Sequence, residues 1–372
     1  MLLPGDPAPM FAADTSVNPQ FKFDAVAGRY IVLCLVGSAA DPFSASVLAE
    51  FDARHARFDS TRTLLLAVTI DPADRGRLTQ RRPGVVYVWD ADTAISRRYD
   101  AVTEPPPTGG GPVAYRPRTL VLDQAMRVLA VLPFDLAAPA SAHVDRVAQV
   151  LDAQPPLEQL TLPAPILVVP HVFESALCDR LVEYYVAHGG QPSGFMREVG
   201  GKTVPVNDPN FKRRADCEVT DGELIRAVHE RLSRRVAPAI QQAYQFNPNR
   251  IERHIVACYD AADGGHFRAH RDNTTRGTAH RRFAVSINLN TDAFDGGELW
   301  FPEFGPRKYK GPSGWAVVFS CSLLHEVTPV SSGRRFAFLP FLYDDAAAAV
   351  RDRNRQYLAT AAAPAGETGA LP

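Results

Sequence analysis

The first 150 residues alternate short apolar runs with a stretch of helical spacing. Apolar runs of about four to eight residues predict buried strands, and here they lie at residues 30–36, 63–70, 85–89 and 119–122. Between the first two runs, apolar side chains recur at helical spacing and predict a helix over residues 44–58. This alternation predicts an α/β layer around a largely buried sheet.

After residue 165 the pattern changes to long helical stripes and then to strands. Apolar stripes predict one helix over residues 174–188, ended by Gly189 and Gly190, and a second over residues 221–244. Strands are predicted farther on, at residues 255–259, 283–290, 298–302, 315–320 and 336–343. Asp295-Gly296-Gly297 predicts a tight hairpin turn between two of them. Helices followed by antiparallel strands predict an α+β domain with a β-sandwich or jelly-roll core.

The chain has 372 residues, which is more than a typical single domain and enough for two. A stretch rich in Pro, Leu and Gln predicts a linker over residues 153–165. We therefore expect a first domain over 1–152 and a second over 166–346, followed by a helix remnant and a disordered tail over 347–372. The Pro/Gly-rich tract 104–112 predicts a surface loop inside the first domain.

The overall charge and the cysteines exclude several classes of protein. A formal net charge of −1 gives no reason to expect a nucleic-acid or membrane partner. The basic clusters 212–214 and 281–282 are interpreted as solvated faces. Five scattered cysteines, without a C-x-x-C, indicate a reducing compartment. The start lacks a basic n-region, and no stretch reaches the roughly 18–20 apolar residues of a membrane span. We expect a cytoplasmic protein without a signal peptide.

The strongest candidate for chemistry is His270-Arg271-Asp272. His270 and Asp272 lie at the end of a strand-like segment, where residues two apart point to the same face. His325 follows the apolar run 315–319, a buried strand that can deliver it to the same ion. Two neutral nitrogens and one carboxylate suit Fe(II) and leave three adjacent coordination positions free. Zinc and manganese would bind such a set as well.

A second H-x-D in the chain, His143-Val144-Asp145, serves as a control for the first. It lies in a segment with apolar residues at helical spacing. On a helix, residues two apart point to nearly opposite sides and cannot share a metal. The sequence therefore predicts no metal site here and a surface position for His143.

The motifs around His270 form a longer series. The series consists of Tyr259, Gly264-Gly265-His266-Phe267, His270-Arg271-Asp272, Arg282, Asn288-Leu289-Asn290, Gly296-Gly297-Glu298-Leu299-Trp300-Phe301, Leu324-His325-Glu326-Val327-Thr328-Pro329-Val330 and Gly333-Arg334-Arg335. It resembles the Fe(II)- and 2-oxoglutarate-dependent dioxygenases, in the prolyl 4-hydroxylase-like branch, over residues 165–345. The resemblance implies a double-stranded β-helix, with iron on His270, Asp272 and His325.

The resemblance also implies that 2-oxoglutarate chelates the iron through its keto-acid end and reaches a basic residue with its distal carboxylate. By the family's spacing that residue is Arg335, whose planar guanidinium suits a carboxylate. Arg334 would point to the opposite sheet face, because strand side chains alternate. Tyr259 resembles the family tyrosine that lines the 2-oxoglutarate pocket; the alternative is a core tyrosine, since the loop before His270 is slightly longer than usual.

The implied activity is an O2-dependent hydroxylation. Related halogenases lack the acidic ligand, so Asp272 favours hydroxylation, coupled to decarboxylation of 2-oxoglutarate to succinate and CO2, with ascorbate in a supporting role. The substrate is a prolyl peptide or protein, or an amino-acid-like small molecule, and the sequence does not separate these. Segments 195–217 and 273–280 are candidate substrate loops, and the first could close as a lid. The alternative is a non-turnover sensor or partner-binding protein that binds iron and 2-oxoglutarate.

The N-terminal part carries a second resemblance. Gly5-Asp6-Pro7-Ala8-Pro9-Met10-Phe11, the strand 31–36 and the segment 118–123 resemble the peroxiredoxin/thioredoxin-like fold over residues 1–150. A peroxidatic cysteine should follow the first long strand at the start of the next helix. The segment 37–44 contains none, and Cys34, inside an apolar strand, is predicted to be buried and inert. We expect a non-catalytic domain that serves as a scaffold, as a substrate-presenting module or as the surface of a homodimer.

Overall fold

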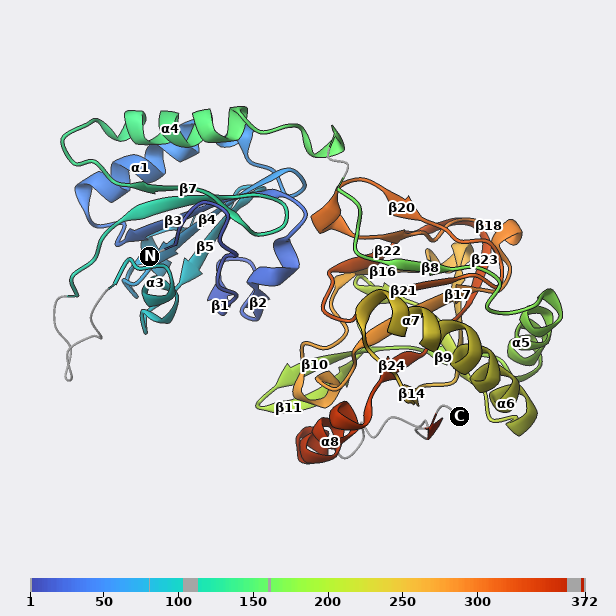
Figure 1. The fold of residues 1–372 in the computed structure, drawn as a ribbon. Helices are drawn as coiled ribbons and strands as arrows, with labels where there is room; N and C mark the ends of the chain where they lie inside the picture. The colour runs from blue at the N-terminus through green and yellow to red at the C-terminus, as the bar shows by residue number, and fades with distance from the viewer. Residues whose placement is uncertain (1, 80, 103–112, 160–161, 360–368, 371–372) are drawn as a thin grey trace. The chain divides into compact units, whose positions relative to one another are not determined.

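The computed structural model describes residues 2–79, 81–102, 113–159, 162–359 and 369–370 (Figure 1). The chain divides into two compact units: Met1–Pro163 with Pro302–Pro306, and Ala164–Phe301 with Arg307–Pro372. The loop predicted over 104–112, and residues 360–368 and 371–372 of the predicted tail, lie outside the described residues. Among the helices that the structure describes, none is long and apolar enough to span a bilayer.

A seven-stranded sheet forms the centre of the N-terminal unit, with the strand order β2-β1-β5-β4-β3-β6-β7. The strands are β1 (Ala12–Thr15), β2 (Phe21–Lys22), β3 (Tyr30–Gly37), β4 (Thr63–Thr69), β5 (Val85–Trp89), β6 (Arg118–Leu122) and β7 (Val128–Pro133). β3, β4 and β5 are parallel to one another, β6 is antiparallel to β3, and β7 is antiparallel to β6. Every residue of β3 is buried, as its apolar run predicts. This is a thioredoxin-like fold.

Helices cover this sheet on both faces (Figure 1). α1 (Pro42–Ala53) and α4 (Ala140–Asp152) pack against one another on one side, and the short α3 (Ala94–Arg98) lies on the other. A further short helix, α2 (Asp74–Arg77), follows β4. The side chains of α1 and α4 share one apolar core with the β3 side chains of that face.

His143 is buried, so its predicted surface position is wrong. Its exposed fraction is 3%, and its ring lies 4.5 Å from the ring of Phe134. Its Nε2 lies 2.8 Å from Thr119 Oγ1. Because the core-facing stripe of α4 is wide enough to include His143 beside Val144 and Val147, the histidine faces the sheet. Asp145 points away and pairs with Arg54 instead, so the helix does separate the two polar residues of this H-x-D.

The C-terminal unit is a jelly roll made of two sheets. The smaller has the order β12-β16-β22-β19-β20, and the larger contains the path β25-β14-β24-β17-β23-β15-β13-β9 with β8, β18 and β21 attached. The strands are β8 (Leu167–Val169), β9 (Gln191–Pro192), β12 (Lys212–Arg213), β13 (Ala215–Glu218), β14 (Arg250–Glu252), β15 (Ile255–Asp260), β16 (His266–His270), β17 (Phe283–Asn288), β18 (Phe294–Gly296), β19 (Leu299–Trp300), β20 (Lys308–Tyr309), β21 (Ala316–Ser320), β22 (His325–Val327), β23 (Val330–Phe338), β24 (Phe341–Tyr343) and β25 (Gly369–Ala370). A separate hairpin joins β10 (Phe195–Val199) to β11 (Lys202–Val206).

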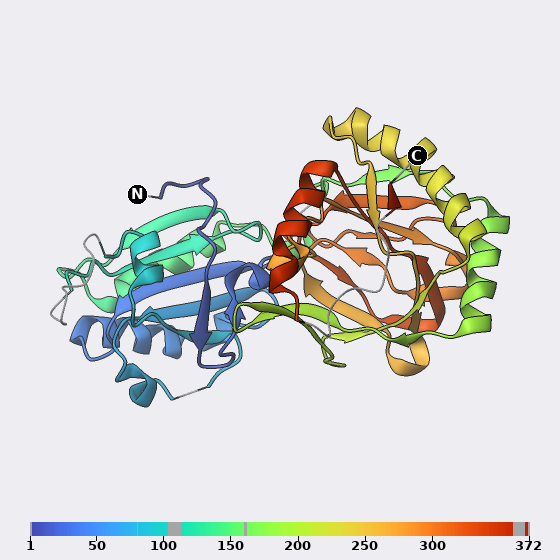
Figure 2. The same cartoon turned by 90° about the horizontal axis from the view of Figure 1, so that it is seen from below.

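Helices cover the outside of the larger sheet (Figures 1 and 2). α5 (Ser175–His188) has nearly the predicted bounds. The second predicted helix is α6 (Gly222–Arg231) and α7 (Ala237–Tyr244), joined by a π-helical turn over Leu232–Val236. Its predicted apolar stripe is buried in the core of the unit. α8 (Asp345–Asn354) follows the last barrel strand, β24.

The segment Asp295-Gly296-Gly297 is not the predicted hairpin turn. β18 before it pairs with β23, whereas β19 after it pairs with β20 and β22. Both glycines have positive φ, and a Cβ on Gly296 would lie 2.2 Å from the carbonyl oxygen of Pro329. The two glycines therefore carry the chain from one sheet to the other, and glycine is required because the backbones approach so closely.

Candidate metal centre

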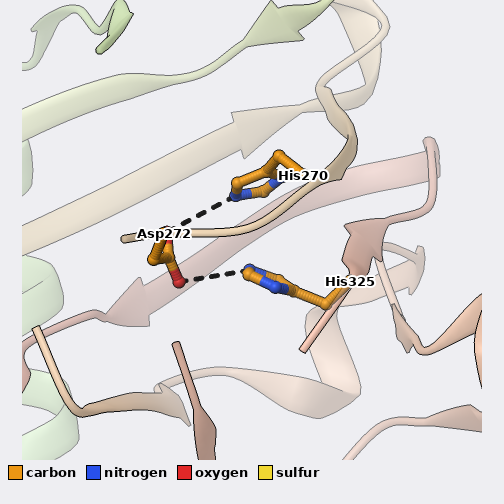
Figure 3. A group of neighbouring side chains, drawn as sticks. All are labelled: His270, Asp272 and His325. Atoms are coloured by element: carbon orange, nitrogen blue, oxygen red, sulfur yellow. Dashed lines mark ion pairs between the residues drawn. The ribbon is translucent and has the colours of Figure 1, made fainter. Parts of the chain in front are cut away.

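The structure brings His270, Asp272 and His325 together at one end of the smaller sheet (Figure 3). His270 is the last residue of β16 and His325 the first of β22, and the two are paired across these antiparallel strands. Asp272 lies two residues beyond β16. One ligand atom from each residue lies within 4.8 Å of the others. This geometry can hold one metal ion on three sides.

Backbone carbonyls fix the orientation of both imidazoles. Nδ1 of His270 lies 2.7 Å from the carbonyl oxygen of Arg268, and Nδ1 of His325 lies 3.0 Å from that of Leu323. Because a carbonyl can only accept, each Nδ1 carries the hydrogen, and each Nε2 keeps its lone pair. The Nε2 atoms of His270 and His325 lie 3.6 and 3.4 Å from the carboxylate oxygens of Asp272. Such carbonyl bonds commonly orient metal-ligating histidines.

Electrostatics favours the protonation states that a metal needs. Burial lowers the pKa of His325 to about 4, so its imidazole is neutral at pH 7. Burial opposes ionisation of Asp272, but the neighbouring His325 and His270 hold the pKa of that carboxyl below its usual range. Two neutral nitrogens and one ionised carboxylate are the donor set of mononuclear non-haem iron centres.

A buried ion pair supports the loop that carries Asp272. The Asp272 backbone N–H donates to the carbonyl of Cys321 at 2.9 Å, and Arg281 Nη1 lies 3.4 Å from the Asp272 carbonyl. Arg281 also donates two hydrogen bonds to Glu252, at 2.7 and 3.1 Å, and His280 lies 2.6 Å from the same carboxylate. No sequence motif pointed to Glu252. The interpretation of Arg281 as a solvated residue is wrong, since Arg281 is buried.

Arg335 lies in the larger sheet with its guanidinium buried. Its exposed fraction is 1%, whereas Arg334 is exposed, as alternation along a strand predicts. Nε donates to Asn288 at 3.0 Å and Nη2 to Ser286 at 2.9 Å. Nη1 is buried and has no hydrogen-bond partner among the described residues. An unpaired buried donor costs about 1–3 kcal/mol, so this position fits an incoming carboxylate.

Tyr259 lies directly opposite Arg335 in the pairing of β15 with β23. Its ring is buried, and its centroid is 5.1 Å from Cζ of Arg335. On the other side of Arg335, a Cβ on Gly297 would lie 3.0 Å from its Cδ. Tyr259 and Gly297 therefore fix the path of the Arg335 side chain.

The candidate substrate loops are in contact with one another. Arg276, in the loop after Asp272, lies 3.5 Å from Glu198 of β10, and the Gly277 N–H donates to Thr203 Oγ1 of β11 at 2.9 Å. Among the strands of the segment 195–217, β10 and β11 form a hairpin separate from the two sheets. In the second half of the segment, β12 pairs with β16 and β13 pairs with β15. Any lid is therefore limited to the hairpin.

The N-terminal unit has no thiol at the start of α1. Ser44 lies in the first turn of the helix and donates to the carbonyl of Val36 at 2.8 Å, while the Asp41 carboxylate accepts from its backbone N–H at 2.8 Å. Burial raises the pKa of the Cys34 thiol to about 12. Cys34 is buried, as predicted, and its raised pKa disfavours the reactive thiolate.

Comparisons with known proteins match the two units separately. The sequence model of the 2OG-Fe(II) oxygenase superfamily matches residues 254–343, and that of the AhpC/TSA family matches residues 4–131. A PKHD-type hydroxylase of Hyphomonas neptunium is 28% identical over 155 residues, which cover 39% of this chain and 66% of that protein. A PKHD-type hydroxylase of Nitrosomonas eutropha is 36% identical over 101 residues, which cover 25% of this chain and 43% of that protein.

The crystal structure of peroxidoxin BcpB from Mycobacterium tuberculosis is similar over 42% of this chain and 100% of that one, with 17% identity and a TM-score of 0.35. This chain spans less than two thirds of the length of the two hydroxylases. Residues 254–343 are thus similar to the 2OG-Fe(II) oxygenase superfamily, and residues 4–131 are similar to the AhpC/TSA family.

Proposed function

We propose that this protein is a 2-oxoglutarate- and O2-dependent hydroxylase in which His270, Asp272 and His325 hold Fe(II). The observation that carries the proposal is the convergence of two lone-pair nitrogens and one carboxylate within 4.8 Å. The two relatives are named PKHD-type hydroxylases, which agrees with this reaction class. When bound, Fe(II) with 2-oxoglutarate and O2 supplies the oxidising chemistry that converts a substrate C–H bond to C–OH.

Arg335 and Tyr259 are proposed to bind the distal carboxylate of 2-oxoglutarate. The unpartnered Nη1 of Arg335 provides a charged donor, and its bonds to Asn288 and Ser286 hold the guanidinium in one orientation. A preoriented guanidinium loses little entropy when the carboxylate binds.

Aromatic side chains pack against both histidines of the metal centre. The Phe267 ring stacks on His270 with a centroid distance of 3.5 Å, and the Phe319 ring lies 4.6 Å from that of His325. These rings also fix the planes of the two imidazoles.

The substrate is proposed to be a prolyl peptide or protein, or an amino-acid-like small molecule, with ascorbate as a supporting reductant. The N-terminal unit is proposed to serve as a scaffold or as a dimerisation surface, because Ser44 and the Asp41 carboxylate occupy the start of α1.

The metal ligands can be tested by spectroscopy and by product formation. Anaerobic addition of Fe(II) and 2-oxoglutarate should give a visible charge-transfer band, and O2 should then yield succinate. His270→Ala and Asp272→Ala should abolish both signals, whereas His188→Ala, which changes an exposed histidine of α5, should retain both. A full band in either site variant would refute the ligand assignment. If the unmodified protein gives the band but forms no succinate with any substrate offered, it is a non-turnover sensor.

A further inference from the structure

A second group of charged side chains lies beside the metal centre. We call Lys212, Arg214, Arg253 and Asp216, together with Ser193, the basic cluster. Lys212 Nζ donates to Ser193 Oγ at 2.8 Å and to the Gly194 carbonyl at 2.6 Å. Ser193 Oγ in turn lies 2.5 Å from Asp216, which accepts from Arg214 at 2.6 Å. The run Lys212-Arg213-Arg214 was interpreted from sequence as a solvated face, but Lys212 is only 6% exposed.

Contacts link the basic cluster to both parts of the proposed active site. Lys212 Nζ lies 4.8 Å from the centroid of the Phe267 ring, which stacks on His270. Arg214 Nη1 lies 3.4 Å from the Tyr259 hydroxyl. Tyr259 therefore contacts Arg214 and Arg335, because Cζ of Arg214 lies 5.8 Å and Cζ of Arg335 lies 5.1 Å from its ring centroid.

The basic cluster carries more positive charge than its own residues compensate. It contains three cations, Lys212, Arg214 and Arg253, against the single carboxylate of Asp216, from which Arg253 is 3.6 Å away. The nearby Glu252 is already paired with Arg281. Burial lowers the pKa of Lys212 well below its usual value and that of Arg253 to about 10, so the excess charge is unfavourable in the free protein.

Two polar atoms of the basic cluster also lack partners. Arg214 Nε and Asp216 Oδ1 are both buried and have no hydrogen bond to any residue that the structure describes. Native proteins satisfy most buried polar atoms. The unpaired Arg214 Nε, in a region of excess positive charge, is a donor that a bound anion would satisfy, whereas Asp216 Oδ1 is an acceptor that an anion would not satisfy.

2-Oxoglutarate does not account for this anion. Under the proposed function, one carboxylate of 2-oxoglutarate binds the metal and the other binds Arg335. Arg335 has its own unpartnered donor for that purpose. The positive charges of Lys212, Arg214 and Arg253 therefore remain after the co-substrate is bound. They are available to a second anion bound beside it.

We propose that the substrate is a carboxylate-bearing small molecule whose carboxylate binds Lys212 and Arg214 beside the metal centre. This inference rests on the proposed function and narrows its substrate class. An uncharged residue within a peptide chain would leave the buried positive charge uncompensated, whereas a free carboxylate accepts from both cations. Lys212 and Arg214 are thus specificity-determining residues.

Anion binding to the full chain tests the proposal without knowledge of the substrate. The protein is loaded with Zn(II) and saturated with N-oxalylglycine, an inert analogue of 2-oxoglutarate. Acetate, the probe carboxylate, is then titrated at constant ionic strength, and its neutral analogue acetamide serves as the control ligand. Acetate should raise the thermal unfolding midpoint in a saturable way, and acetamide should not.

Substitutions assign the effect to the basic cluster. Lys212→Met and Arg214→Gln should weaken apparent acetate affinity about tenfold, and the charge-retaining Lys212→Arg and Arg214→Lys should restore part of it. Arg334→Gln, at an exposed arginine of β23, should leave acetate binding unchanged. N-oxalylglycine affinity should change less than about twofold in all of these variants.

Three results would overturn the proposal. In the first, acetate and acetamide raise the unfolding midpoint equally. In the second, acetate binds Lys212→Met and Arg214→Gln as tightly as it binds the unmodified chain. In the third, these substitutions lower the affinity for N-oxalylglycine and not the affinity for acetate. The last result would assign the basic cluster to the co-substrate. Absence of Zn(II) and N-oxalylglycine binding in the unmodified chain would refute the proposed function itself, so the two failures are distinguishable.

Discussion

Hydrogen bonds to two backbone carbonyls set the tautomers of His270 and His325. They hold the hydrogen on Nδ1 and direct Nε2 toward Asp272. The carbonyls belong to Arg268 and Leu323, each two residues before its histidine, so local backbone conformation sets the tautomer. The identity of those two residues matters little, because only their main chains take part.

Arg335 should determine 2-oxoglutarate affinity without affecting the metal. Arg335→Gln removes the charge and the free Nη1 donor, and a charge-assisted hydrogen bond contributes about 1.5–3 kcal/mol. We therefore expect affinity to fall about 10- to 100-fold. Titration of the visible band of the anaerobic Fe(II) protein measures this. Arg334→Gln provides the matched control, and equal losses in the two variants would contradict the assignment.

His143 should make the stability of the chain depend on pH. Burial lowers its pKa from the ordinary 6.5 to about 4. Between these values the unfolded chain binds a proton that the folded chain does not, so stability is complete above about pH 6.5 and falls as pH drops toward 4. Urea unfolding of the full chain at pH 7 and pH 5 measures this loss, which should be smaller in His143→Phe. An unchanged loss in that variant would exclude His143 as the cause.

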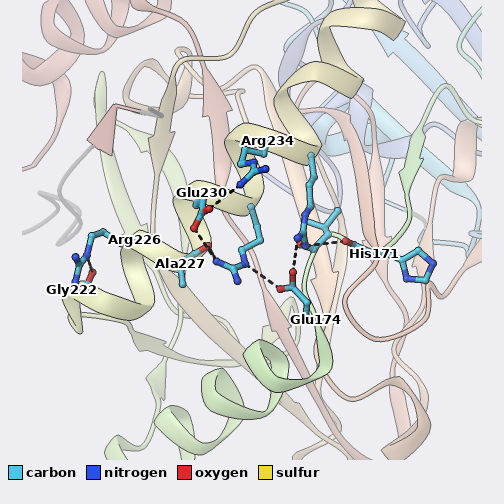
Figure 4. Close-up of polar contacts among 10 residues, drawn as sticks. His171, Glu174, Gly222, Arg226, Ala227, Glu230 and Arg234 are labelled. Atoms are coloured by element: carbon cyan, nitrogen blue, oxygen red, sulfur yellow. Dashed lines mark hydrogen bonds and ion pairs between the residues drawn. The ribbon is translucent and has the colours of Figure 1, made fainter.

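At the scale of elements, an exposed ionic network joins α5 to the π-helical turn (Figure 4). Glu174, which precedes α5, accepts from Arg231 at 3.1 Å and also contacts Arg235. Arg235 donates in addition to the Val172 carbonyl at 2.7 Å, and Glu230 contacts Arg231 and Arg234. Arg231 and Arg235 are four residues apart and lie on the same side of this helical segment, so both reach the Glu174 carboxylate.

This network should stabilise the fold only weakly. The hydrogen bond from Arg235 and the neighbouring Arg231 lower the pKa of Glu174 from 4.5 to about 2, so its contribution is present above pH 4.5 and is lost as pH falls toward 2. The side chain is 46% exposed, so solvent and salt screen the interaction. Glu174→Gln should lower the free energy of unfolding by less than about 1 kcal/mol at neutral pH. High salt should remove most of the difference between the two proteins, and a larger, salt-independent loss would contradict this account.

The sequence predicted the elements better than their connections. The strand at residues 63–70 is found as β4 (Thr63–Thr69), because a long apolar run has few alternatives in a buried sheet. The pair Gly296 and Gly297 was assigned to a hairpin because such turns use glycine. A crossing between sheets needs positive φ as well, and which strand pairs with which depends on contacts distant in sequence.

Within the candidate site, the structure brings His270, Asp272 and His325 together, as their spacing and strand placement predict. Sequence reasoning failed for Lys212 and Arg281. The residue type alone does not tell whether a lysine or arginine is buried or solvated. The presence of an ion-pair partner, such as Glu252 for Arg281, distinguishes the two cases. That partner lies on another strand, so no local pattern reveals it.

At the scale of the whole molecule, the chain joins a thioredoxin-like unit to a unit in which His270, Asp272 and His325 lie together. In the first unit β3 is buried throughout, and α1 begins at Pro42 with the Asp41 carboxylate as its N-cap. Cys34 is buried in β3, and the Asp41 carboxylate accepts from the Ser44 N–H at the start of α1.

The two ends of the proposed co-substrate site belong to different sheets of the jelly roll. His270 and His325 lie on the smaller sheet, and Tyr259 and Arg335 on the larger. A 2-oxoglutarate molecule bound at both ends would link the two sheets. The sheets could then separate only after 2-oxoglutarate had dissociated. By mass action, a higher concentration of 2-oxoglutarate would then make the protein more resistant to unfolding and to proteolysis. The supply of 2-oxoglutarate would thus set the lifetime of the protein as well as its rate of turnover.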